Sequence, residues 1–147
     1  MRLNFPKILL LIVTLSLAAS TLQACSSTSA SVGLKMMPMD KMPAEVQAAP
    51  SVVRAAYQFA AANPDVISGI PCYCGCGSIG HTSNYSCYVQ GSAANGAIAW
   101  DDHALGCSLC VNITQDAMRL TKEGKSVPDI RAYVDGTYAK YGTSNMP

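Results

Sequence analysis

The sequence predicts a small, mainly α-helical domain with an irregular, cysteine-rich loop region. Apolar residues recur at helical spacing, bounded by capping and breaking residues, over three segments at 52–62, 108–123 and 127–141. Between the first two segments, residues 65–95 are dense in glycine, serine and cysteine and show no alternation typical of a strand. Such a region has no regular core of its own, so we expect metal ions or disulfides to hold it in place.

The first predicted helix, 52–62, is rich in alanine and follows Ser51, whose hydroxyl can cap a helix N-terminus. It ends at Asn63-Pro64, because proline lacks an amide donor and disfavours the α conformation in the residue before it. We expect this helix to pack in a small helical core.

The other two predicted helices are amphipathic. The second stops at Gly124 and places four apolar residues on one face, namely Leu109, Ile113, Ala117 and Leu120. The third is capped by Ser126, tolerates Pro128 in its first turn and ends before Gly142. Its apolar stripe consists of Val127, Ile130, Val134 and Tyr138. Core packing is the simplest interpretation of both stripes.

The N-terminal residues 1–24 have the order of a signal peptide, with basic residues, an apolar run over 8–17 and small residues before a cleavage site. The apolar run is shorter than the roughly 20 residues that a membrane-spanning helix needs. The tetrad 22–25 (Leu-Gln-Ala-Cys) resembles the lipobox of bacterial lipoproteins, in which the cysteine is lipidated. We therefore expect acyl chains on Cys25 to anchor the mature protein to the extracytoplasmic face of a membrane in the bacterial cell envelope.

The mature chain divides into a spacer and a domain. Residues 25–50 are rich in serine, alanine, methionine and proline and predict a lipid-anchored flexible spacer, whereas 51–147 form a Cys/His-rich domain. Loss of the leader removes two of the ten basic residues, which leaves eight against nine acidic ones. Nucleic acid is not an expected partner, because no basic stripe is present to neutralise phosphates.

Six cysteines and both histidines are clustered in and beside the irregular region. They are Cys72, Cys74, Cys76, His81, Cys87, His103, Cys107 and Cys110. Thiolate and imidazole are the ligands that suit Zn, Cu(I) and Fe–S centres. A disulfide between cysteines two residues apart would be strained, so the three cysteines of 72–76 fit metal binding better. These eight side chains are the predicted metal ligands.

The segment 103–110 allows two local structures. As one helix, it would place His103, Cys107 and Cys110 on the same face. With a helix that begins at Ser108, the two cysteines would instead lie at a helix N-terminus, where the dipole favours thiolate. Two other functions stay open: a thiol–disulfide redox protein that uses Cys107 and Cys110, although no βαβ pattern precedes them, and an interaction module stapled by three disulfides.

A methionine-rich run favours copper over zinc as the metal. Met36, Met37, Met39 and Met42 follow the predicted lipid anchor closely, and thioethers prefer Cu(I). We predict a non-enzymatic protein that sequesters the ion or hands it to a metal transporter or metalloenzyme at the membrane, with these methionines as auxiliary ligands. Structural zinc held by four of the six thiols is the competing interpretation.

The hexapeptide Pro-Cys-Tyr-Cys-Gly-Cys and the segments that follow it resemble the bacterial PCYCGC-motif lipoproteins. The matching segments are 71–76, 80–81, 102–110, 123–126 and 130–135, together with Cys87. The resemblance covers roughly residues 50–141, and the methionine run lies outside it. It implies a location outside the cytoplasm and a role for the Cys/His set, but this largely uncharacterised family supplies no reaction.

Overall fold

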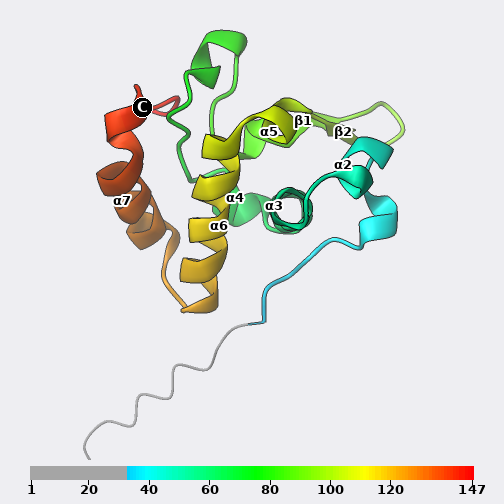
Figure 1. Cartoon of the computed structure of the whole chain (residues 1–147), viewed down its shortest axis with the longest axis horizontal. Coiled ribbons are helices and arrows are strands. Elements are labelled where there is room, and N and C mark those ends of the chain that lie inside the picture. Colours follow the sequence, from blue (N-terminus) through cyan, green and yellow to red (C-terminus); the bar gives the residue numbers. More distant parts are fainter. Residues whose placement is uncertain (1–32) are drawn as a thin grey trace, which may run out of the picture.

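The computed structural model describes residues 33–147 (Figure 1). The predicted signal peptide (1–24) and Cys25 lie outside the described residues. The helices of the described part are α2 (Ala44–Ala48), α3 (Ser51–Ala62), α4 (Pro64–Ile67), α5 (His103–Gly106), α6 (Ser108–Lys122) and α7 (Val127–Tyr138). Two strands, β1 (Val89–Ser92) and β2 (Ile98–Trp100), and four 3₁₀ turns, η2 (Met39–Lys41), η3 (Cys76–Ile79), η4 (Tyr85–Cys87) and η5 (Ala139–Tyr141), complete it. Over residues 33–147, no helix has the length and apolarity needed to cross a membrane. The predicted mainly α fold class with an irregular Cys-rich region is confirmed.

Helix α6 is the centre of the helical body, with α3 packed on one side and α7 on another (Figure 1). The predicted apolar faces point into the core. Their buried members are Ile113, Ala117 and Leu120 in α6 and Ile130, Val134 and Tyr138 in α7. Leu109 and Val127 are half-buried at the margin of the same core. The 3.6-residue period therefore identified these two packed faces correctly.

Most of the predicted helix ends agree with the structure, including the end of α3 before Asn63-Pro64. Ser126 caps α7, where its Oγ accepts a hydrogen bond from the Asp129 amide at 3.4 Å. Gly124 follows α6 with a φ of +76°, the left-handed conformation that glycine adopts without strain. The predicted Ser51 cap is wrong, because α3 begins one residue earlier than expected and Pro50 occupies the capping position.

The hairpin of β1 and β2 was not predicted from the sequence. The pairing is antiparallel and has an irregular register between Val89 and Gly91. Only Val89 is buried in β1, and the other three residues of the strand are exposed. The strand therefore lacks the alternation of apolar and polar residues by which a strand is recognised in a sequence. The hairpin matters for the site because it returns the chain to the core, where the Asp101 amide donates to the Tyr88 carbonyl at 2.9 Å.

Residues 33–50, the described part of the predicted flexible spacer, pack against α3. The Met37 amide donates to the Gln58 carbonyl at 3.0 Å, and Gln58 Nε2 donates to the Met37 carbonyl at 2.7 Å. Met42 and Val46 are buried in the main core. The sequence did not reveal this packing, because isolated apolar residues make it on an otherwise exposed segment. Residues 33–50 therefore belong to the folded body.

Replacement of Val46 tests this packing. Val46 is 1% exposed, so we expect Val46→Ala to lower the free energy of unfolding by about 1–2 kcal/mol, from the loss of two buried carbons. Val52, at the start of α3, is 47% exposed, and Val52→Ala should change that free energy by less than about 0.5 kcal/mol. Urea denaturation of both variants checks the prediction, and equal effects would contradict it.

Candidate metal centre

The hexapeptide 71–76 forms a turn on which three cysteines converge. Gly75 has a φ of +85°, a left-handed conformation that lets the chain bend into η3. Cys72 and Cys76 are buried and Cys74 is partly exposed. The Sγ atoms of Cys72 and Cys74 lie 3.4 Å apart. The motif thus presents three thiols to one point.

The C-terminal tail holds this turn in place through Asn145. Its Oδ1 accepts a hydrogen bond from the Cys72 amide at 2.7 Å, and its Nδ2 donates to the His81 carbonyl at 3.2 Å. The same Nδ2 lies 3.6 Å from the Cys76 Sγ. Asn145 was not predicted as a site residue, because no local pattern links a residue near the C-terminus to the loop around 72–81.

The chain between His103 and Cys110 is not one continuous helix. α5 ends at Gly106, Cys107 is extended with φ −115° and ψ 95°, and α6 begins at Ser108. The alternative with the helix beginning at Ser108 is therefore confirmed. His103, Cys107 and Cys110 nevertheless converge, because the break at Cys107 folds α5 back over the start of α6.

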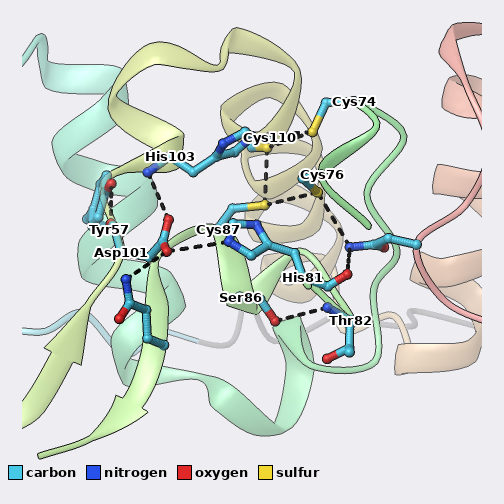
Figure 2. A network of polar contacts seen from close by, with 12 residues as sticks. Tyr57, Cys74, Cys76, His81, Thr82, Ser86, Cys87, Asp101, His103 and Cys110 are labelled. Atoms are coloured by element: carbon cyan, nitrogen blue, oxygen red, sulfur yellow. Dashed lines mark hydrogen bonds and ion pairs between the residues drawn. The ribbon is translucent and has the colours of Figure 1, made fainter. Parts of the chain in front are cut away.

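Cys110 is the centre of the sulfur cluster (Figure 2). Its Sγ lies close to four other sulfurs, those of Cys87 at 3.2 Å, Cys72 at 3.3 Å, Cys107 at 3.3 Å and Cys74 at 3.6 Å. The six cysteines of the described region are free thiols, so the alternative with three disulfides finds no bonded pair there. Two sulfurs bound to one tetrahedral zinc ion would be separated by about 3.8 Å. Modest movements would open the cluster to that spacing.

The two histidines lie against the sulfurs (Figure 2). His103 Nε2 is 3.5 Å from the Cys74 Sγ, and the two imidazole rings meet edge to face with centroids 5.2 Å apart. His81 Nε2 lies 3.4 Å from Asp101 Oδ2, whereas its Nδ1 is buried without a hydrogen-bond partner. A buried, unpaired nitrogen is unfavourable, and a metal ion would satisfy it while Asp101 orients the ring.

All eight predicted ligands belong to one cluster of overlapping sets. Within each set, the sulfur and nitrogen atoms lie within 4.8 Å of one another. The two larger sets are Cys74, His103, Cys107 and Cys110, and Cys76, His81, Cys87 and His103. The two smaller sets are Cys72, Cys74 and Cys76, and Cys72, Cys87 and Cys110. The cluster could therefore hold a metal ion, as the spacing of the cysteines and histidines predicts.

Asp101 is a second site residue that the sequence did not predict. Its Oδ1 accepts a hydrogen bond from the His103 amide at 2.8 Å, and its Oδ2 accepts one from Gln90 Nε2 at 3.1 Å and faces His81. The carbonyl of Asp101 accepts from the Tyr57 hydroxyl at 2.8 Å. The one available signal was its position two residues before His103. Asp101 thus connects both histidines to the hairpin and to α3.

A buried polar network fixes the backbone at Cys110. The Tyr88 hydroxyl donates to the Cys110 carbonyl at 3.0 Å and lies 2.7 Å from Thr114 Oγ1. Asn84 Nδ2 donates to Thr114 Oγ1 at 2.9 Å. Tyr88, Asn84 and Thr114 are fully buried, so their hydrogen bonds hold the first turn of α6 rigidly against the irregular loop.

Burial and mutual hydrogen bonding shift the pKa values of the thiols. Hydrogen bonds from Cys110 and Cys87 lower the pKa of Cys72, and the bond that Cys110 donates to Cys72 raises the pKa of Cys110. Burial raises the pKa of Cys74 and of Cys76. Most of the thiols are therefore protonated without metal, and metal binding must release protons, so affinity rises with pH.

The predicted auxiliary methionines lie in the segment that packs on α3. Met42 is buried in the core, and Met37 and Met39 pack against it. Met37 also borders a shallow hollow with Ile98 and Trp100 of the hairpin. Their role as auxiliary ligands stays a prediction.

Comparison with known proteins gives one result for this chain. The model of a family described as a protein of unknown function with PCYCGC motif matches residues 11–146. No curated protein and no solved structure matches the chain.

Proposed function

The chain belongs to the PCYCGC-motif family, whose function is unknown, and we propose that it binds a soft metal ion, preferentially Cu(I), in the bacterial cell envelope. It would sequester the ion or hand it to another protein and would carry out no catalytic step. The observation that carries the proposal is the convergence of six free thiols and two imidazoles in one cluster, with His81 Nδ1 unpaired among them.

The ligand chemistry supports copper over zinc. Thiolates dominate the cluster, and the set of Cys72, Cys87 and Cys110 is made of sulfur alone and is fully buried. Soft ligands of this kind select Cu(I), and the methionine run at 36–42 would extend the same preference. Zinc remains the competitor, because each of the two four-ligand sets also suits a tetrahedral ion.

The proposed location rests on the leader sequence. The signal peptide over 1–24 and the lipobox that ends at Cys25 would leave the protein lipid-anchored outside the cytoplasm. An anchored cluster would meet metal transporters or metalloenzymes of the same membrane, so the partner we propose is one of these. Cell fractionation with and without Cys25→Ser would test the anchor.

Thiol–disulfide exchange is a second candidate function. The Sγ atoms of Cys107 and Cys110 lie 3.3 Å apart at the N-terminus of α6, and Cys107 is partly exposed. A helix N-terminus favours thiolate, which is the reactive form. Against this role, Cys110 is fully buried and lies equally close to Cys72 and Cys87, so it has no dedicated partner.

Metal binding is tested on the full chain carrying Cys25→Ser, which removes the lipidation site and keeps the six cluster cysteines. We expect the reduced protein to take Cu(I) from a chromophoric chelator and to bind Zn(II) more weakly in a parallel titration. Elemental analysis after desalting measures the bound metal. Cys107→Ser should weaken Cu(I) binding, whereas Ser108→Ala, at the exposed neighbouring position, should leave it unchanged.

Two results would overturn the proposal. One is a purified protein that holds three disulfides, has no metal and shows no Cu(I) affinity after reduction. The other is rapid, reversible oxidation of Cys107 and Cys110 with disulfide reductase activity and no metal uptake, which would assign the redox function instead.

A further inference from the structure

The cluster holds more soft ligands than one ion can use. An ion in a thiolate and imidazole site takes about four ligands, whereas eight converge here. No set of mutually close ligand atoms in the described residues contains more than four of the eight side chains. One ion would therefore leave several thiols unused in the interior.

The two four-ligand sets overlap in a residue that cannot serve both. His103 belongs to each set. A neutral imidazole nitrogen has a single lone pair and binds one metal, so a second ion needs a different shared ligand. A thiolate sulfur has several lone pairs and can bind two ions at once. The shared ligand of a two-ion cluster must therefore be a cysteine.

Cys110 is in the position that a bridging thiolate requires. Its Sγ lies 3.3 Å from Cys107 and 3.6 Å from Cys74, with which it shares one ligand set. It also lies 3.3 Å from Cys72 and 3.2 Å from Cys87, with which it forms a second set made of sulfur alone. The Cys110 sulfur therefore lies within 3.6 Å of four of the other five cluster sulfurs. Tyr88 fixes its backbone by the hydrogen bond to the carbonyl.

We propose that the cluster binds two Cu(I) ions bridged by the Cys110 thiolate, an inference that rests on the proposed metal-binding function. The first ion is held by Cys74, His103 and Cys107, and the second by Cys72 and Cys87, with Cys76 and His81 next to Cys87. Each thiol that binds loses its proton to the solvent, and neither copper nor sulfur changes oxidation state.

The two ions have different surroundings. Cys74, His103 and Cys107 are partly exposed, whereas Cys72 and Cys87 are fully buried. The first ion is therefore the more exchangeable of the two, which suits a protein that retains one ion and transfers another.

Stoichiometry and X-ray absorption of the Cu(I)-loaded full chain carrying Cys25→Ser test the bridge. We expect two ions per chain and a copper–copper scattering contribution. Cys107→Ser should lower the retained stoichiometry to one ion and abolish that contribution. Cys110→Ser should abolish the contribution and weaken binding of both ions by about tenfold or more.

The outcomes separate the bridge from metal binding itself. Saturation at one ion per chain, or two ions without copper–copper scattering, would overturn the bridge and leave the proposed function standing. No bound ion would overturn the proposed function. If Cys110→Ser does not give the wild-type circular dichroism spectrum, the wild-type and Cys107→Ser measurements still decide the inference.

Discussion

Loading the cluster with Cu(I) is expected to raise the free energy of unfolding by about 4 kcal/mol when the free ion is at about 1,000 times its dissociation constant. The ligands come from three separate stretches, 72–76, 81–87 and 103–110, which the unfolded chain does not bring together. Binding free energy is thereby converted into folding free energy. Between residues 68 and 88 the only regular structure is short 3₁₀ turns, so metal binding should stabilise this part of the chain most.

Thermal and urea unfolding followed by circular dichroism measure this gain, with and without Cu(I) under reducing conditions. A Cys74→Ser and Cys107→Ser double variant serves as control and should gain clearly less, because the first ligand set keeps only His103 and Cys110. Equal stability of the loaded and metal-free protein would contradict the prediction, as would an equal gain in the double variant.

The helices were predictable because their signals are local. Ser126 and Gly124 mark helix ends through the backbone conformation that each favours, and the stripe that contains Ile113 repeats at a helical period. The hairpin has no such local signal, since Gly91 and its irregular register remove the alternation by which a strand is recognised. The packing of Val46 could not be predicted either, because a single buried residue has no period.

The candidate site likewise has residues that the sequence predicts and residues that it does not. The eight Cys and His ligands were predictable from chemistry and spacing, and the structure brings all of them into one cluster. Asn145 and Asp101, which position them, were not, because each acts across the fold on residues distant in sequence. Carboxamide and carboxylate side chains are also common on surfaces, so their type alone predicts no such role.

Asp101→Asn is expected to weaken Cu(I) binding by about 10- to 100-fold, the range seen when residues that orient metal ligands are replaced. The carboxylate faces His81 Nε2 at 3.4 Å, while its other oxygen accepts from the His103 amide at 2.8 Å. Asp101 belongs to none of the ligand sets, so it acts on the metal through the histidines. An asparagine keeps the size of the side chain but removes the negative charge that supports His81 as a donor.

The neighbouring Asp102→Asn is the matched control. Asp102 is exposed, and its carboxylate makes no hydrogen bond or ion pair with either histidine, so loss of the same charge one residue away should leave Cu(I) affinity unchanged. The backbone bonds of residue 101 to Tyr57 and Tyr88 survive the substitution at that position, so metal-free Asp101→Asn should unfold close to wild type. Chelator competition measures affinity and urea denaturation measures stability. Unchanged affinity in Asp101→Asn, or a loss matched by Asp102→Asn, would rule out the positioning role and leave His81 oriented by packing alone.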